Sequence, residues 1–121
     1  MRIQYASMDY PRDIDMSDIL ARLGAQIDAR RHSDATESYT ASLFAGGDDA
    51  ILKKVGEEAV EFILAAKGDK PDRVVSEAAD VWFHMLVMMS AKGLGPQDIL
   101  NELQRREGVS GHAEKASRAS K

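Results

Sequence analysis

Five acidic side chains recur at helical spacing in two nearby stretches of the chain. Glu57, Glu58 and Glu61 form the first group, and Glu77 and Asp80 form the second after fifteen intervening residues. Residues three or four apart lie on one face of an α-helix, so two neighbouring helices would bring these carboxylates to about the same depth. Hard divalent cations bind carboxylate oxygens, and Mg²⁺ combines them with water and phosphate oxygens. The pattern therefore predicts a Mg²⁺ site, in which Mn²⁺ is a possible substitute.

The second acidic group lies in the most apolar segment of the chain. Residues 74–89 are apolar nearly all round the helix that they predict, which is typical of a buried helix. Glu77, Asp80 and His84 form one narrow polar stripe on it, and buried carboxylates require cations, protons or a bound metal. We expect His84 to contact the metal ligands rather than the ion, and to orient Asp80 or Glu77. Iron is less favoured, because the di-iron bundle pattern places a His three residues after a Glu.

The elements that must position these groups are helices. Apolar residues recur at three- and four-residue spacing along most of the chain, without the alternation of a half-buried strand. Capping residues, Pro and Gly delimit five predicted helices, at 17–31, 38–44, 48–67, 71–92 and 95–106. The connections at 68–70 and 93–95 are short, which indicates antiparallel neighbours. The expected fold class is an all-α, antiparallel helical bundle.

The third predicted helix carries apolar residues on two faces. One stripe is expected to face the core: Ile51, Leu52, Val55, Ala59, Phe62, Ile63 and Ala66. Glu58 and Glu61 border this stripe, which predicts half-buried acids. Val60 and Leu64 occupy the far side. A helix that buries two faces is typical of a bundle extended by a second subunit, so we expect dimerisation to complete or extend a four-helix core.

The composition fits one domain and excludes several classes of function. The chain has 121 residues, 44% of them hydrophobic, which suffices for one core and leaves no room for a second domain. We expect the domain to span residues 17–107, between a loosely ordered extension, 1–16, and a mobile tail, 108–121. The net charge of -4 offers no basic field for nucleic acid. The absence of Cys excludes disulfides and thiolate metal sites.

The sequence has no feature typical of a secretory signal or a membrane span. Charged residues interrupt the N-terminal stretch, and the longest apolar run, Val81–Met89, is about half the length that spans a bilayer. We therefore expect a cytoplasmic protein with no membrane partner.

A non-enzymatic function also fits the acidic motif. A Glu-Glu-x-x-Glu motif alone is usually a solvated helix face. The chain would then be a non-catalytic acidic helical interaction module. The second motif, Glu77-x-x-Asp80 on an apolar helix, favours a functional site instead.

The combined motifs resemble those of a known enzyme family. The strings KKVGEEAVEFILAAKGD and SEAADVWFHMLVMM, preceded by SYTASLFAGG, are similar to phosphoribosyl-ATP pyrophosphohydrolases of histidine biosynthesis. These form one branch of the all-α, MazG-like nucleoside triphosphate pyrophosphohydrolases. The resemblance covers about Ser38 to Arg106, and the tail REGVSGHAEKASR shares it. Trp82-Phe83 departs from the family pattern, in which a Leu-Tyr pair is common, and so removes a hydroxyl group beside His84.

The resemblance implies Mg²⁺-dependent hydrolysis of 1-(5-phosphoribosyl)-ATP to 1-(5-phosphoribosyl)-AMP and pyrophosphate, in a homodimer. The candidate metal ligands are Glu58, Glu61, Glu77 and Asp80. Glu57 either completes the site or accepts a proton from the attacking water, so Glu57, Glu58 and Glu61 are the candidate catalytic residues. The closest alternative function is a house-cleaning nucleoside triphosphate pyrophosphohydrolase of the MazG type, which would use the same carboxylates.

The resemblance also suggests residues that contact the nucleotide substrate. Lys53 and Lys54 are candidates for phosphate contacts. Ser38, Tyr39 and Thr40 are candidates for contacts to the ribose or the ribosyl phosphate. A helix cap and a packing tyrosine explain Ser38 and Tyr39 equally well.

Overall fold

The computed structural model describes residues 18–109 and 111–119, which form helices joined by turns and short loops. No strand occurs within these ranges, so the predicted all-α fold is confirmed. The helices are α1 (Ile19–Ala29), α2 (Tyr39–Gly46), α3 (Asp48–Lys67), α4 (Pro71–Ala91), α5 (Pro96–Arg106) and α6 (Gly111–Ala119). The five predicted helices correspond to α1 to α5. The predicted extension, 1–16, and the predicted helix start at Ser17 lie outside the described residues.

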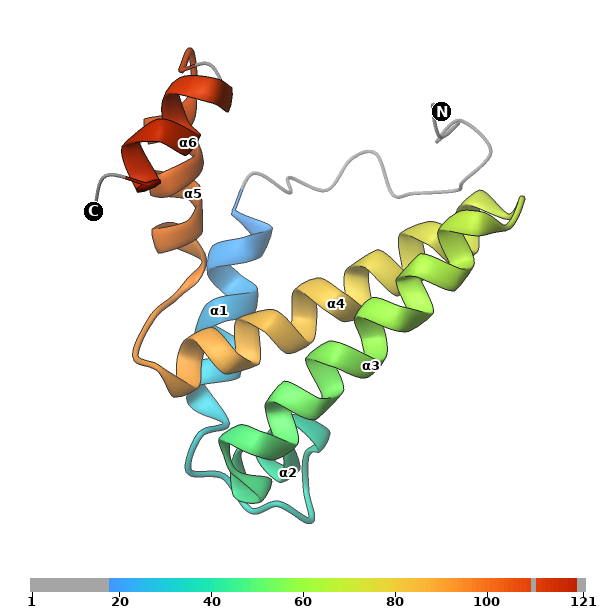
Figure 1. The fold of residues 1–121 in the computed structure, drawn as a ribbon. Coiled ribbons are helices and arrows are strands. Elements are labelled where there is room, and N and C mark those ends of the chain that lie inside the picture. The colour runs from blue at the N-terminus through green and yellow to red at the C-terminus, as the bar shows by residue number, and fades with distance from the viewer. Residues whose placement is uncertain (1–17, 110, 120–121) are drawn as a thin grey trace.

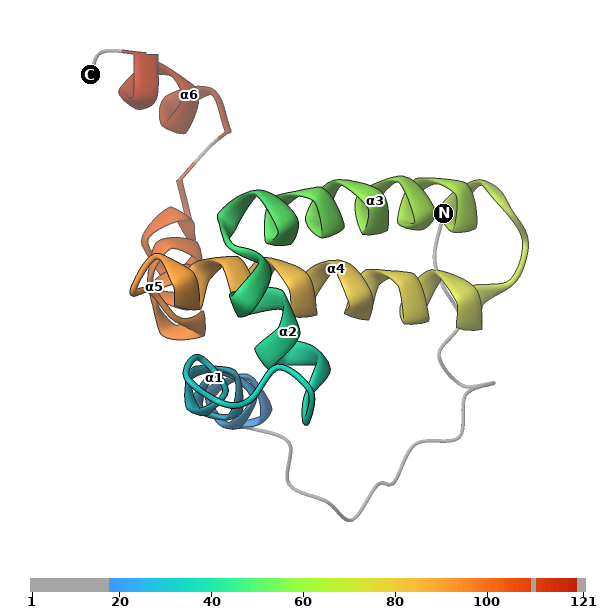
Figure 2. The ribbon, with the colours of Figure 1, turned by 90° about the horizontal axis from the view of Figure 1, so that it is seen from below.

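A long antiparallel hairpin of α3 and α4 dominates the structure (Figures 1 and 2). Pro71 begins α4, where the missing N–H of proline leaves no hydrogen bond unmade. α3 ends at Lys67, and the N–H of the next residue, Gly68, donates to the Ala65 carbonyl oxygen. Because residues 68–70 alone connect the two helices, α3 and α4 lie side by side.

The hydrophobic core lies at the open end of this hairpin, where α1 and α2 pack against it (Figure 2). Its buried residues come from four helices: Ile27 of α1, Leu43 of α2, Ile51 of α3, and Leu86 and Val87 of α4. Removal of such side chains from water, at roughly 25 cal/mol per Å² of apolar surface, is the main favourable term in folding. The core therefore anchors α1 and α2 to the hairpin.

Two further contacts fix the first and fifth helices. The buried Ser90 hydroxyl of α4 donates a hydrogen bond to the Asp28 carboxylate of α1. Where α1 meets α5, a Cβ atom on Gly24 would lie 2.7 Å from Cδ of Pro96. The close approach of α1 to the start of α5 therefore depends on a glycine at this position.

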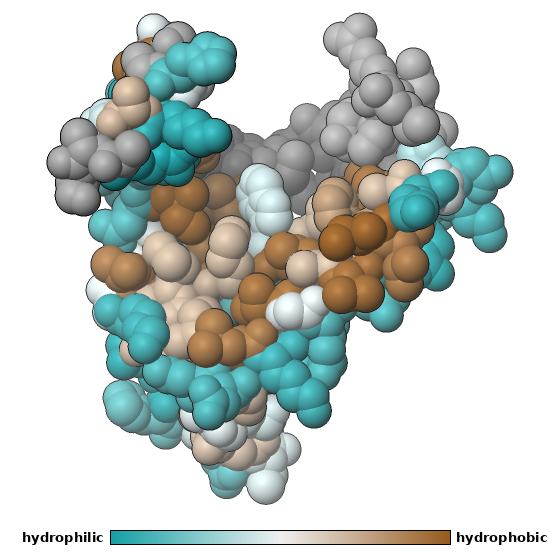
Figure 3. Space-filling model, viewed as in Figure 1, coloured by the Kyte–Doolittle hydropathy of each residue, from teal (hydrophilic) through white to brown (hydrophobic). Residues whose placement is uncertain are grey.

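One side of the hairpin is apolar and exposed, which differs in part from our expectation (Figure 3). Leu52 and Ile63 belong to the stripe predicted to face the core, yet they are 50% and 55% exposed. Val60 and Leu64, on the predicted second apolar face, are 54% and 59% exposed. The reason is that α3 packs mainly against α4 and α2 within one chain, and these two helices cover only part of its circumference.

The fourth helix is also less buried than we expected. Trp82 is 56% exposed, although its helix is apolar nearly all round. By length and composition α4 is the one helix of the described ranges that is able to cross a membrane, a test that core helices also pass. Glu77 and Asp80 lie within it, and ionisable groups are costly in a bilayer. These acids indicate a helix of a bundle rather than a membrane span.

The sixth helix was not predicted from the sequence. α6 lies in the segment for which we predicted a mobile tail. Its side chains at His112, Lys115 and Arg118 are exposed, and it follows α5 away from the tip of the hairpin (Figures 1 and 2). The mobility of the tail stays a prediction.

Candidate active site

Three of the five predicted carboxylates meet between α3 and α4. One side-chain oxygen of each of Glu58, Glu77 and Asp80 lies within 4.8 Å of the other two. Glu58 and Glu77 are partly buried, whereas Asp80 is exposed. A set of carboxylate oxygens at these separations suits a hard divalent cation, and the exposed side leaves room for water and phosphate oxygens.

Two basic side chains flank this carboxylate cluster. Lys54 Nζ lies 3.4 Å from Oε1 of Glu58. On the opposite helix, Arg73 Nη2 lies 3.5 Å from Oε1 of Glu77. Among the described residues Asp80 has no basic partner. Arg73 was missed in the sequence analysis, although its position four residues before Glu77 is a signal for this ion pair.

Tyr39 connects the first turn of α2 to α4 and lies near enough to Lys54 of α3 to affect its charge. Its hydroxyl oxygen lies 2.7 Å from Nε2 of His84, and the ring of His84 is buried. Charge interaction with the Tyr39 side chain, followed by the hydrogen bond to Glu58 and the charges of Glu58 and Glu57, raises the pKa of Lys54. Lys54 therefore keeps its positive charge beside the acids at neutral pH.

His84 contacts the backbone of Asp80 instead of the carboxylate that we expected it to orient. Nδ1 of His84 lies 2.7 Å from the backbone carbonyl oxygen of Asp80. A carbonyl oxygen only accepts, so Nδ1–H donates to it, and Nε2 is left for the contact with the Tyr39 hydroxyl. Whether His84 supports the site through this contact stays a prediction.

Three other predicted residues lie at the edge of the carboxylate cluster. Glu61 is exposed and lies outside it, where it lines a pocket of about 300 Å³ together with Arg73. Glu57 forms ion pairs with Lys53, at 3.9 Å, and with Lys54, at 3.6 Å. The roles of Glu61 as a ligand, of Glu57 as a base and of Lys53 as a phosphate contact stay predictions.

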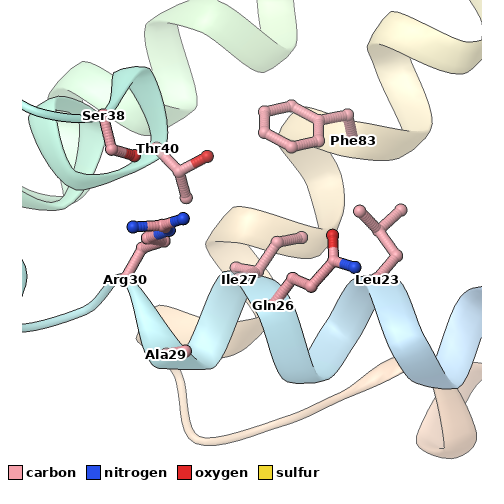
Figure 4. A pocket seen from close by; sticks show the side chains of 8 residues that line it. All are labelled: Leu23, Gln26, Ile27, Ala29, Arg30, Ser38, Thr40 and Phe83. Carbon is pink, nitrogen blue, oxygen red and sulfur yellow. The ribbon is translucent and has the colours of Figure 1, made fainter.

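The start of α2 has a structural role and also lines a pocket. Ser38 caps α2, since its Oγ accepts a hydrogen bond of 3.2 Å from the N–H of Ala41. Ser38 and Thr40 line a pocket with Arg30 and Phe83 (Figure 4). The sequence did not indicate a role for Arg30 at this pocket. Arg30 lies at the end of α1, and only the fold brings it close to the start of α2. The predicted contacts of residues 38–40 with substrate stay predictions.

The two arginines at the end of α5 are engaged with an acid of their own helix. Both Arg105 and Arg106 bind Glu102. These hydrogen bonds lower the pKa of Glu102 to about 2.

In the described residues, helices without strands and carboxylates gathered in an antiparallel hairpin form the arrangement expected of an all-α nucleotide pyrophosphohydrolase. The family model of phosphoribosyl-ATP pyrophosphohydrolase matches residues 20–107. Proteins named phosphoribosyl-ATP pyrophosphatase from Burkholderia ambifaria (strain MC40-6), Burkholderia cenocepacia (strain HI2424) and Burkholderia vietnamiensis (strain G4 / LMG 22486) are similar to this chain. Each is 54% identical over 105 residues, which cover 84% of this chain and 87% of the relative.

The chain therefore belongs to the phosphoribosyl-ATP pyrophosphohydrolase family. The resemblance seen in the sequence is confirmed, and so is the prediction of an enzyme of the hydrolase class. A non-catalytic interaction module is disfavoured by the same match.

The contact between Tyr39 and His84 is expected to stabilise the fold. Tyr39→Phe should lower the free energy of unfolding by about 1 kcal/mol, because it removes the partner of a buried ring nitrogen. In the double variant with His84→Phe, both polar partners are gone, and the loss should be smaller than the sum of the two single losses. Urea unfolding of the four proteins measures this coupling, and additive losses would contradict it.

Proposed function

We propose that this chain hydrolyses 1-(5-phosphoribosyl)-ATP to 1-(5-phosphoribosyl)-AMP and pyrophosphate, a step of histidine biosynthesis. The family membership supports the substrate and the bond that is cleaved. The proposal rests on the proximity of Glu58, Glu77 and Asp80. Hydrolysis of a triphosphate needs a place where the charge of the phosphates is neutralised, and a cation held by these carboxylates would provide it. The acidic, all-α chain fits a cytoplasmic enzyme with no nucleic-acid or membrane partner.

Mg²⁺ is the proposed cofactor, and Mn²⁺ its substitute. Glu58, Glu77 and Asp80 would hold the ion, with Glu61 as a further ligand from the adjoining turn of α3. When bound, such an ion neutralises phosphate charge and lowers the pKa of a coordinated water. All four proposed ligands are oxygen donors, which suits this choice of ion.

The side chains around the cluster would position the triphosphate and the water. Lys54 and Arg73 stand on opposite sides of the acids, where each can bind a phosphate oxygen at the expense of its present ion pair. Glu57 either completes the site or takes a proton from the water that cleaves the phosphoanhydride bond. It is exposed next to Glu58, so it is open to solvent and to substrate.

The proposed active form is a homodimer that covers the exposed apolar side of the hairpin. Val60, Ile63, Leu64 and Trp82 are all more than half exposed in one chain. Monomeric proteins rarely leave a contiguous apolar patch of this kind open to water (Figure 3). A second copy of the hairpin presents the same apolar side, so the two would form a closed, symmetric pair.

Turnover of the proposed substrate tests the function directly. The purified protein with Mg²⁺ should convert phosphoribosyl-ATP to phosphoribosyl-AMP and pyrophosphate, with both products identified by mass. A panel of ordinary and deoxynucleoside triphosphates should be hydrolysed at least about a hundredfold more slowly, because a site that bonds an added group discriminates against analogues without it. Equal hydrolysis of the panel would favour the house-cleaning enzyme, and no turnover of any triphosphate would favour the interaction module.

Metal binding should raise the thermal stability of the protein. At a Mg²⁺ concentration 100 times the Kd, the stabilisation is about 2.7 kcal/mol, a shift of several degrees in Tm. Asp80→Asn should remove this shift and turnover together, since it removes one of the clustered carboxylates. Asp49→Asn, an exposed acid in the first turn of α3, is the matched control and should behave as the wild type. A wild-type Tm that does not respond to Mg²⁺ or Mn²⁺ would refute the metal site.

A charge on the apolar side of the hairpin should separate the dimer. Light scattering after size exclusion should give the wild type twice the chain mass of 13.3 kDa. Val60→Glu should shift it to the mass of one chain, because burial of an unpaired carboxylate is unfavourable. Val109→Glu makes the same change at an exposed valine outside the hairpin and should leave the dimer intact. A dimeric Val60→Glu variant would place the interface elsewhere.

A further inference from the structure

A pocket between α1 and the start of α2 combines a guanidinium group with hydroxyl groups. Its volume is about 390 Å³, within the range of sites that hold small molecules. In Figure 4 the side chain of Arg30 points toward the turn that carries Ser38 and Thr40. The rest of the space is lined by Phe83 of α4 and by four residues of α1: Leu23, Gln26, Ile27 and Ala29. The pocket thus has a cationic, hydroxyl-rich end and a more apolar end.

The polar groups at this pocket have few partners in the protein. Within residues 18–109 and 111–119, the guanidinium of Arg30 forms no hydrogen bond or ion pair. The two acids near it in sequence are engaged elsewhere: Asp28 accepts a hydrogen bond from Ser90, and Asp34 accepts one from Thr36. Ser38 Oγ accepts from the backbone, which leaves its O–H able to donate. The pocket therefore offers donors and one uncompensated positive charge.

The pocket lies close to the carboxylate cluster. Phe83 follows Asp80 by three residues on α4, a distance of about 4.5 Å along the helix axis. On the other wall, Tyr39 lies between Ser38 and Thr40 in sequence and contacts His84, which bonds the backbone of Asp80. The pocket and the carboxylate cluster thus lie against neighbouring turns of α4.

We propose that this pocket binds the 5-phosphate of the phosphoribosyl group, an inference that rests on the proposed function. The substrate of that function carries phosphate at both ends, and the carboxylate cluster accounts for one end only. Arg30 forms charge-assisted hydrogen bonds with the phosphate oxygens, and the hydroxyls of Ser38 and Thr40 donate to them. Ordinary nucleoside triphosphates lack the second anionic end, so Arg30 contributes to the choice of substrate.

Steady-state kinetics and binding of the product test this subsite. Arg30→Gln should raise the KM for phosphoribosyl-ATP about tenfold or more and change kcat by less than about threefold, because it removes binding that is shared by ground state and transition state. Calorimetry should show that the wild type binds phosphoribosyl-AMP more tightly than AMP and that Arg30→Gln loses most of this preference. Arg31→Gln, at the adjacent exposed arginine outside the pocket, is the matched control and should match the wild type.

The outcomes separate this subsite from the proposed function. A wild type that turns over phosphoribosyl-ATP, together with an Arg30→Gln variant of unchanged KM and unchanged product preference, refutes the subsite alone. A wild type without turnover refutes the proposed function and the subsite with it. Equal effects of Arg30→Gln and Arg31→Gln would indicate general charge attraction and would also overturn the subsite. Circular dichroism of each variant confirms that the helices are retained.

Discussion

The carboxylates of Glu58, Glu77 and Asp80 repel one another, and the remainder of the fold has to hold them together. Two full charges 4.8 Å apart repel by up to about 3.5 kcal/mol at an effective dielectric constant of 20, and by less where water reaches them, as at Asp80. The ion pairs of Lys54 and Arg73 offset part of this repulsion. Apolar packing opposes the rest, and the structure concentrates that packing toward the open end of the hairpin. The acids are therefore held by helices that are anchored elsewhere.

The hydrophobic core and the acids lie at different places along the hairpin, and this explains why its apolar residues differ in exposure. Near the core, α1 and α2 cover α3 and α4, and Ile51 and Val87 are fully buried. Nearer the tip, α3 leaves Ile63 and Leu64 open to water. A second copy on this side, as proposed, would add the missing packing on the helices that carry the acids. By excluding water, it would also strengthen the attraction between the acids and a bound cation.

Local signals in the sequence were enough to predict α1 to α5, although not α6, whereas the rotation of each helix about its axis depends on distant contacts. Pro71 and Gly68 act on their immediate neighbours, so the ends of α3 and α4 were predictable. The short connection also fixed the pairing: Glu58 and Asp80 are equally far from residue 69, and an antiparallel hairpin places such residues opposite each other. The exposure of Glu61 depends on how α3 is turned about its axis, which packing against α4 and α2 determines. Arg30 was missed because only the tertiary fold brings the end of α1 to the start of α2.

Recognition of a polyanion by an acidic protein must depend on local groups. With a net charge of -4, the chain as a whole repels a nucleotide at long range, so electrostatic steering does not aid association. The positive groups are placed singly instead: Lys54 and Arg73 lie beside the acids, and Arg30 lines the pocket between α1 and α2. A substrate with phosphate at both ends can engage both places at once, whereas a ligand with one anionic end engages only one. If both places bind phosphate as proposed, their spacing, set by α4 and the contact of Tyr39 with His84, would decide which nucleotide binds well.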